Sequence, residues 1–196
     1  RGCTTGSNGT TGLELGSESV GDFSHFLFED HVITGGGDAG IGMAIMGSGL
    51  AAAGISGNGT PEQMIEWVPQ CYGTPEDIKL GAFCVSEPDA GSDVSSLRTR
   101  AVYDEAKDEW VINGMKRWNS GLHHATHDII FARTSGDSGS PVGISAFLVP
   151  TDLPGFNVDF FWWTFNMPTD HAEVSLKDVR VSSTALFGRL DHGLDL

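Results

Sequence analysis

Basic residues are scarce in this chain. Its 196 residues include 11 Lys and Arg against 26 Asp and Glu, which gives a formal net charge of -15. A protein that binds nucleic acid through the phosphates needs a basic face, and docking onto an anionic membrane needs one as well. The composition therefore predicts neither a nucleic-acid partner nor a membrane partner.

Cysteine is also rare. The chain has three cysteines, an odd number: Cys3, Cys71 and Cys84. No two of them have the CxxC spacing that is typical of metal and redox sites. A disulfide framework is usually built from an even number of cysteines. We therefore expect reduced thiols and a cytoplasmic protein, with Cys84 as a small core residue inside the apolar run LGAFCV.

Long uninterrupted apolar runs are missing too. The nearest is AGIGMAIMGSGLAAAGISG, residues 39–57, which is uncharged but contains many glycines. A bilayer span needs about 20 predominantly apolar residues, and we predict a buried helix here instead. No basic segment with an apolar core behind it is visible, so we expect no secretory signal.

Changes in complexity and in the spacing of apolar residues divide the chain into four segments. Residues 1–12 are of low complexity and are expected to be a flexible or artificially added tail. Residues 13–77 show apolar spacings of three and four, which predict a helical segment. Residues 78–190 change to short runs bounded by turn residues. Residues 191–196 resemble the start of a further helix.

The helical segment carries one complete set of end signals. Thr60 is expected to be an N-cap, Pro61 stands at the first helical position, and Gln63 completes a capping box. Pro69 predicts the end of this helix or a bend in it.

Seven short runs predict strands after the helical segment. The second and third flank the charged turn DEAKDE, and Asn113-Gly114 inside the third indicates a turn or a bulge. This pattern favours an α+β protein in which a partial helical domain precedes a small antiparallel β-barrel or sandwich. The predicted strands are residues 80–85, 97–103, 109–118, 128–134, 143–150, 156–163 and 171–181.

The first of these strands runs into a polar turn. SEPDAGSD, from Ser86 to Asp93, packs acids, serines, a proline and a glycine into eight residues. A strand end of this composition can present backbone N–H groups and hydroxyls to an anion or to a flat polar ring. The same residue types dominate ordinary turns, so the alternative is a plain surface turn.

Three segments together resemble the acyl-CoA dehydrogenase family. FCVSEPDAGSD, VINGMKRWNSG and AEVSLKDVRV are similar to the family's (T/S)EPxAGSD motif, its NGxKxWIT-like segment and its closing DVRVP strand. The family has an N-terminal helical domain, a middle β-domain and a C-terminal four-helix domain. The resemblance covers Gly12 to Leu196, and it implies the end of the first domain and all of the second.

The resemblance implies a flavin site at the first turn. An acyl-CoA dehydrogenase removes the α-proton of a thioester and passes the β-hydride to FAD, whose ring is held by hydrogen-bonding groups. The backbone around Phe83 and Val85 and the hydroxyl of Ser86 are then expected to bond that ring. Gly91 would allow close approach of the backbone. Ser92 would contact the pyrophosphate of FAD or the pantetheine arm of an acyl-CoA substrate.

The second segment would complete the flavin site. The resemblance places Trp118 against the flavin, with Asn119 and Ser120 at the ring edge near N5 and O4. The family usually has Ile-Thr where this chain has Asn-Ser, although Ser120 keeps a hydroxyl. The alternative for Trp118 is a core position. Glu87 and Asp93 are expected to brace their turn rather than to move protons.

The segment GLHHATHD brings three histidines close together in sequence. His123 and His127 have the i and i+4 spacing of metal ligands on a helix, and His171 is a further candidate. The segment lies between a turn and a strand and lacks an HExxH glutamate. We therefore expect loop histidines and no metal.

The resemblance also implies a function. The family's catalytic glutamate lies in the C-terminal helical domain, so no residue of this chain is predicted to be catalytic. The leading hypothesis is a fragment of a FAD-dependent acyl-CoA dehydrogenase that acts on acyl-CoA within a homo-oligomer and is inactive alone. The alternatives are a non-catalytic β-domain that binds a ligand or a partner chain, and a relative that uses reduced flavin to activate oxygen.

Overall fold

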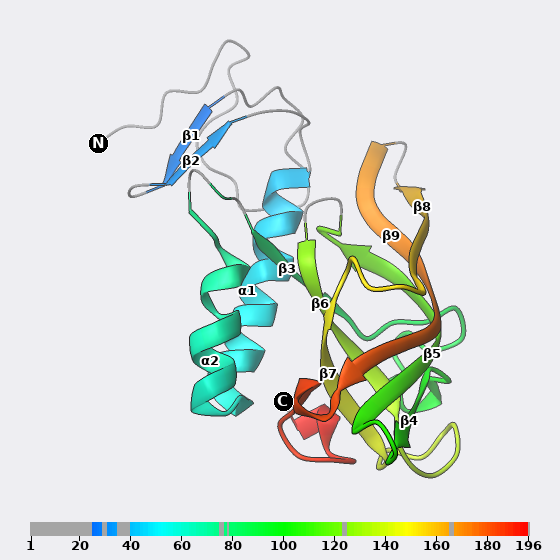
Figure 1. Cartoon of the computed structure of the whole chain (residues 1–196). Coiled ribbons are helices and arrows are strands. Elements are labelled where there is room, and N and C mark those ends of the chain that lie inside the picture. Colours follow the sequence, from blue (N-terminus) through cyan, green and yellow to red (C-terminus); the bar gives the residue numbers. More distant parts are fainter. Residues whose placement is uncertain are drawn as a thin grey trace.

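The fold consists of two helices beside a strand-rich domain, with a small two-stranded unit beyond the start of the first helix (Figure 1). The computed structural model describes residues 25–28, 31–34, 40–74, 77, 79–122, 125–164 and 167–195. The helices are α1 (Gly40–Asn58) and α2 (Pro61–Trp67). The strands are β1 (His25–Phe28), β2 (His31–Thr34), β3 (Leu80–Cys84), β4 (Arg100–Asp104), β5 (Glu109–Ser120), β6 (Ala125–Arg133), β7 (Ile144–Pro150), β8 (Phe156–Thr164), β9 (Met167–Ser182) and β10 (Leu186–Phe187).

Both predicted helices exist, but α1 is buried on one side only, because Ala51, Ala52 and Ile55 are buried whereas Leu50 is 52% exposed. The uncharged run is α1, and α2 begins at a capping box in which the Gln63 N–H donates to the Thr60 hydroxyl at 3.2 Å. The helix ends before Pro69. Gln63 also donates to the carbonyls of Thr184 and Leu186, at 2.8 and 2.9 Å, which ties α2 to the last strand.

Strands β1 and β2 correct the prediction that residues 13–77 are helical throughout. They pair antiparallel, with His25 opposite Thr34. The β-branched residues of HVIT lose rotamer freedom in a helix and favour strands, so the apolar spacing alone was misleading here. The predicted tail, residues 1–12, lies outside the described residues.

The β-domain is a mixed eight-stranded sheet, which confirms the α+β class but corrects the antiparallel barrel. The strand order is β10-β7-β6-β4-β5-β9-β8, and β3 pairs with β6 off this path. β3 runs parallel to β6, and one parallel pair, Arg100 opposite Arg133, joins β4 to β6. Within the described residues no ladder joins β10 to β8, so the sheet is not closed.

The parallel pairing has a topological cause. Parallel neighbours need a long crossover connection, and β4 and β5 with their turns supply it between β3 and β6. All seven predicted strands exist in the structure. At the other end, Gly193–Asp195 form a 3-10 turn rather than the start of an α-helix.

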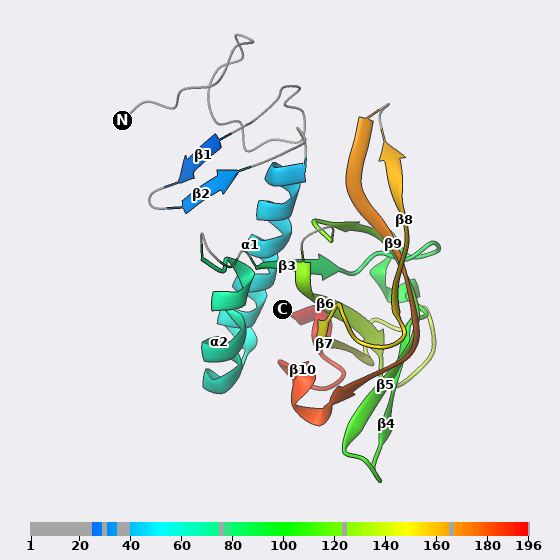
Figure 2. The same cartoon turned by 45° about the horizontal axis from the view of Figure 1, so that its top comes forward.

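Two buried clusters occupy the two faces of β6 and β7, because successive side chains of a strand point to opposite sides. The layers are the helices, then β3-β6-β7-β10, then β4-β5-β9-β8 (Figure 2). The inner cluster, between the strand layers, includes Ala82, Cys84, Ile130, Phe147, Val149, Ala172 and Val174. The helix-side cluster includes Ala51, Ile55, Cys71, Ile129, Phe131 and Leu148.

Two irregularities in the pairing of β5 with β9 shape the candidate site. One lies at Asn113-Gly114, which confirms the predicted bulge signal. A Cβ on Gly114 would stand 2.6 Å from the Thr99 Cα, so a larger residue does not fit there. The other lies at Trp118, which has a φ of 66°. A bulge leaves a residue unpaired and redirects its side chain.

Candidate functional site

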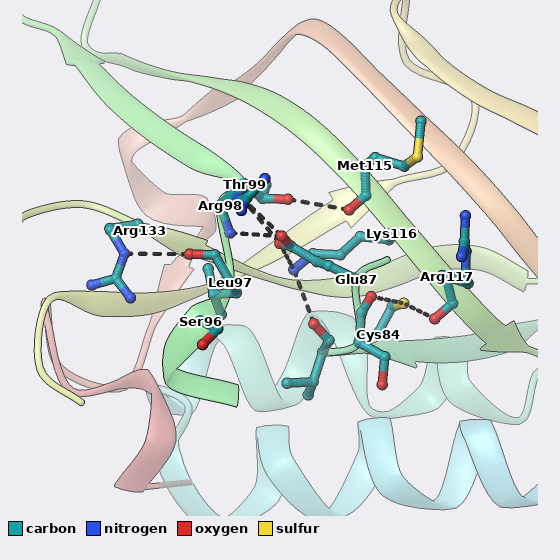
Figure 3. Close-up of polar contacts among 12 residues, drawn as sticks. Cys84, Glu87, Ser96, Leu97, Arg98, Thr99, Met115, Lys116, Arg117 and Arg133 are labelled. Atoms are coloured by element: carbon teal, nitrogen blue, oxygen red, sulfur yellow. Dashed lines mark hydrogen bonds and ion pairs between the residues drawn. The ribbon is translucent and has the colours of Figure 1, made fainter. Parts of the chain in front are cut away.

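The turn after β3 is built around the buried carboxylate of Glu87. Its oxygens accept the N–H groups of Arg98 and Thr99, at 2.6 and 3.1 Å, and the Nζ of Lys116 at 2.8 Å. Figure 3 shows Glu87 at the centre of this network. The predicted bracing role of Glu87 is therefore confirmed.

The negative charge of Glu87 is compensated by the buried ammonium group of Lys116. Burial alone would raise the pKa of Glu87, but the Lys116 charge and the hydrogen bonds together lower it. The Lys116 side chain is 0% exposed and also donates to the Val85 carbonyl at 3.1 Å. The ion pair thus joins the end of β3 to the middle of β5.

The outer part of the same turn faces outward. Asp93 accepts hydrogen bonds from the Ser95 N–H and hydroxyl, at 3.1 and 2.5 Å, and from the Ser96 hydroxyl, so it braces the turn as predicted. Gly91 and Ser92 are exposed. A Cβ added to Gly91 would meet nothing within 4 Å. The fold itself therefore does not require glycine at this position.

A backbone hydrogen bond brings the two predicted turns together. The N–H of Arg117 on β5 donates to the carbonyl of Ser86 at 2.9 Å. Ser86 is half-buried, and among the hydrogen bonds of the described residues its hydroxyl makes none. The strand end and the bulge are therefore held next to each other by this bond.

Trp118 stands out from the bulge. Its positive φ is a genuine outlier for a bulky residue, and its side chain is 44% exposed. Its ring centroid lies 4.8 Å from that of Trp162 on β8. The core alternative for Trp118 is thus wrong.

Arg117 fixes the strand beside Trp118. Its Nε donates to Glu173 Oε2 on β9 at 2.6 Å, and its guanidinium lies 5.0 Å from the Trp162 ring centroid. An arginine above a tryptophan face is attracted by the ring quadrupole. Trp162, which lies across β9 from β5, thus contacts both the exposed ring of Trp118 and the guanidinium of Arg117.

The two residues after Trp118 point to different partners. Asn119 is 0% exposed, and its Nδ2 donates to Asp128 Oδ2. Ser120 is half-buried, and its Oγ lies 2.7 Å from Nδ1 of His171. Burial lowers the pKa of His171. The side chain of Asn119 is therefore turned inward, away from the exposed face of Trp118.

Phe83 and Val85 direct their side chains into the protein. Both are partly buried against the helix-side cluster, and the Phe83 ring lies 5.2 Å from that of Phe131. Their side chains are therefore not available to a ligand, and the Val85 carbonyl already accepts a hydrogen bond from Lys116.

Residues 82–179, which contain both turns and the strands between them, match the family model for the acyl-CoA dehydrogenase middle domain. The chain belongs to the acyl-CoA dehydrogenase family. The resemblance inferred from SEPDAGSD and NGMKRWNSG is thereby confirmed.

Several proteins to which the chain is similar are acyl-CoA dehydrogenases. The mitochondrial short/branched chain specific acyl-CoA dehydrogenase of Rattus norvegicus is 35% identical over 137 residues, 69% of this chain and 30% of that protein. A probable acyl-CoA dehydrogenase from Mycobacterium abscessus has a TM-score of 0.67 at 32% identity and matches over 79% of this chain and 39% of its own. A glutaryl-CoA dehydrogenase from Mycobacterium smegmatis in complex with FADH2 has a TM-score of 0.58 at 32% identity, over 69% and 33%. The chain spans 30% to 36% of the length of three curated relatives.

The residues that the family pattern assigns to a flavin fit that role in part. Ser86, Ser92 and Ser120 offer hydroxyls, Trp118 offers an exposed ring, and Gly91 leaves room for a close approach. Asn119 does not fit as a side-chain ligand, since the inward bulge geometry and the bond to Asp128 bury it. Its backbone lies opposite Ala172 in the pairing of β5 with β9.

Sequence reasoning missed three residues that shape this site and gave a fourth another role. Trp162 contacts Trp118 and Arg117, and Asp128 holds Asn119. His171, considered above only as a metal ligand, bonds Ser120. Asp128 had a signal, because an acid at the start of the apolar strand DIIFAR is unusual in a buried position. The others depend on which strands pair.

The histidines of the segment GLHHATHD can be followed in the structure only in part. His123 and His124 lie outside the described residues, and His127 is buried with its Nε2 3.5 Å from Cys71 Sγ. Burial lowers the pKa of His127 to about 4. No group of three metal-ligating side chains occurs within the described residues. The described helices also include none that is long and apolar enough to span a membrane.

Proposed function

We propose that this chain forms the flavin-facing β-domain of a FAD-dependent acyl-CoA dehydrogenase, whose reaction is α,β-dehydrogenation of an acyl-CoA thioester. The observation that carries the proposal is the hydrogen bond from Arg117 to Ser86, which joins the two family motifs into one surface beside the exposed Trp118. The FADH2 complex of the related glutaryl-CoA dehydrogenase supports the choice of cofactor.

The residues of this surface have separate roles in the proposal. Trp118 packs against the flavin ring, and the hydroxyls of Ser86 and Ser120 donate hydrogen bonds to its polar edge. Backbone groups around Phe83, Val85 and Asn119 complete that edge. When bound, FAD would accept the hydride that leaves the β-carbon of the thioester.

The substrate is assigned to the outer turn. Gly91 lets the backbone approach a phosphate or the pantetheine arm closely, and Ser92 donates to it. No acid of this surface is assigned as the base, because Glu87 and Glu173 are held by Lys116 and Arg117. The catalytic carboxylate is therefore proposed to come from outside the described surface.

A homo-oligomer and a cytoplasmic location belong to the same proposal. β8 is an edge strand with exposed Val158, Phe160 and Trp163, and exposed apolar groups of this kind favour association. The buried free thiols of Cys71 and Cys84 suit a reducing compartment.

The first test is flavin retention. The chain is incubated with FAD and desalted, and the visible spectrum of the protein fraction is recorded. Trp118→Ala should weaken retention about tenfold, the size of one aromatic stacking contact, and Ser86→Ala should weaken it less. Trp163→Ala, which removes an exposed tryptophan from β8, should leave retention unchanged. Equal losses in Trp118→Ala and Trp163→Ala would contradict the assigned surface.

The reaction class is tested with substrate. Anaerobic addition of an acyl-CoA to the flavin-loaded chain should leave the flavin oxidised if the catalytic carboxylate is supplied from elsewhere. Bleaching by substrate alone would show that this chain carries its own base and would overturn that part of the proposal.

A further inference from the structure

A carboxyl group lies buried directly beneath the second turn. Asp128 and Asn119 are both 0% exposed, and Nδ2 of Asn119 donates to Oδ2 of Asp128. The remaining oxygen of each side chain, Oδ1 of Asn119 and Oδ1 of Asp128, is buried without a hydrogen-bond partner. Orphaned buried polar atoms are rare in native proteins and call for an explanation.

One proton satisfies both oxygens. An ionised carboxylate and an amide oxygen are both acceptors, so they cannot bond to each other. A protonated carboxyl has an O–H donor, and the amide of Asn119 has the matching acceptor. Acid and amide then join through two hydrogen bonds, one in each direction.

We propose that Asp128 is a neutral acid in the folded protein, that it forms a two-bonded pair with the Asn119 amide, and that this pair positions Trp118 for the flavin. The statement about protonation stands on the buried geometry alone. The statement about positioning rests on the function proposed above.

The surroundings of Asp128 favour the neutral form. Its cross-strand neighbours are Ala82 on β3 and Val149 on β7, and both are buried and apolar. Burial disfavours a charged carboxylate, and it raises the pKa of Asp128 to about 7 against the opposing effects of the Asn119 amide, the Lys116 charge and the Ile129 backbone N–H.

None of the charged and titratable groups around Asp128, within the described residues, is a positive charge that pairs with Asp128 alone. Lys116 on β5 is the nearby cation, and its Nζ already bonds Glu87 at 2.8 Å. Burial raises the pKa of Cys84 on β3, so this thiol is neutral. His127 precedes Asp128 on β6 and points to the other face, towards Cys71. The facing residues of β7 and β9 in the inner cluster are apolar.

The pair formed by Asn119 and Asp128 holds the backbone next to Trp118, whose conformation is strained. A bulky residue with a φ of 66° persists only where its neighbours fix it. Arg117 is fixed on one side by the Ser86 carbonyl and Glu173. On the other side Asn119 is fixed by Asp128. Ionising Asp128 removes the donor to Asn119 Oδ1 and loosens that side.

The protonation is tested by comparing unfolding of the wild type with Asp128→Asn. Asparagine places an NH2 donor group and an acceptor oxygen where the protonated acid has its O–H and its carbonyl oxygen, and its charge does not change with pH. The folded pKa of about 7 lies above the ordinary 3.8, so stability from the neutral acid is present at low pH and is lost as pH rises towards 7. The ratio of the wild-type to the variant unfolding constant should therefore rise about tenfold per pH unit in this window and then level off.

The comparison isolates Asp128, since His127 contributes equally to both proteins. A ratio that stays constant from pH 4 to 8 would overturn the proposal, because Asp128 would then be ionised throughout. If Asp128→Asn does not fold, infrared spectroscopy of the wild type with labelled aspartate decides the same point. A protonated-carboxyl band at pH 6 that vanishes at pH 8.5 supports the proposal, and no such band overturns it.

The positioning role is tested by flavin retention at pH 6 and pH 8.5. We expect retention by the wild type to weaken about tenfold at the higher pH, and retention by Asp128→Asn to be independent of pH. Asp128→Leu, which leaves Asn119 without a partner, should retain less flavin than Asp128→Asn at both values.

The outcomes separate the two claims. Equal wild-type retention at both pH values, together with a titrating unfolding ratio, would overturn the positioning role and leave the proposed function intact. No retained flavin in any variant would contradict the proposed function and the positioning role together. The unfolding and infrared experiments would still decide the protonation of Asp128.

Discussion

The buried ion pair between Lys116 and Glu87 leads to a quantitative stability prediction. Their side chains are 0% and 5% exposed, and Nζ lies 2.8 Å from Oε1. With an effective dielectric constant of about 20, the attraction at this distance is about 6 kcal/mol, much of it offset by the desolvation of both charges. Replacing Lys116 by Met leaves the carboxylate buried with backbone donors alone. We expect the free energy of unfolding to fall by about 3–5 kcal/mol.

Urea unfolding followed by tryptophan fluorescence measures this loss. A whole domain is typically stable by about 5–15 kcal/mol, so the change is a large fraction of the total. Arg98→Ala is the matched control, because the Arg98–Asp89 pair has a 3.0 Å separation but side chains 71% and 63% exposed. Such a surface pair contributes at most about 1 kcal/mol. A loss in Lys116→Met no larger than in the control would refute the reasoning.

The same pair predicts an acid-side pH dependence. The pKa of Glu87 is lowered from its ordinary 4.5, with burial opposed by the Lys116 charge and the hydrogen bonds. Its stabilising contribution is therefore complete above that ordinary value and is lost as pH falls through the lowered one. Glu87→Gln should be less stable at neutral pH but should lose less stability than the wild type on acidification. An unchanged acid dependence in this variant would show that Glu87 is not responsible.

Three further predictions concern two glycines near the site, the start of α2, and the pair formed by Asn119 and Asp128. Gly114→Ala should lower stability by about 3 kcal/mol through its clash with the neighbouring backbone, whereas Gly91→Ala should change it by less than about 0.5 kcal/mol and reduce flavin retention; thermal unfolding and desalting measure these. Gln63→Ala should cost about 1–2 kcal/mol in urea unfolding, because a cap and two carbonyl contacts are lost. Asn119→Ile and Asp128→Leu should each cost about 1–3 kcal/mol, and the double variant should cost less than their sum in the same assay.

Local chemistry made much of the fold predictable. The capping box at Thr60 to Gln63 fixes the start of α2, and the Asn113-Gly114 signal marks a real bulge. The strands of the β-domain follow from their composition and their turns. Asp93 braces the polar turn because a short acid finds the Ser95 N–H and the Ser96 hydroxyl two and three residues away. The bracing by Glu87 depends on more distant partners, since Arg98, Thr99 and Lys116 lie 11, 12 and 29 residues along the chain.

The remaining features of the fold and the site depend on which strands pair with each other, and the sequence does not show that directly. The helical period around Phe26 and Leu27 also fits a hairpin, and the β-branched residues of β2 decided against the helix. The direction of β3 follows from its choice of β6 as partner. Family resemblance located Trp118, but the inward turn of Asn119 follows from the bulge and from an acid on another strand.

Asn119 stands where the family usually has Ile, and Asp128 on another strand provides the hydrogen-bond partner that this amide needs. An amide buried among apolar groups is costly unless it is hydrogen-bonded, and here the acid at Asp128 provides the bond from the neighbouring layer. An acid in that position is equally costly without the amide. Each residue therefore makes the other tolerable, and the polar pair replaces apolar packing beneath the strained Trp118. Asn119, which departs from the family's usual Ile, is thus part of the pair proposed to position the exposed ring.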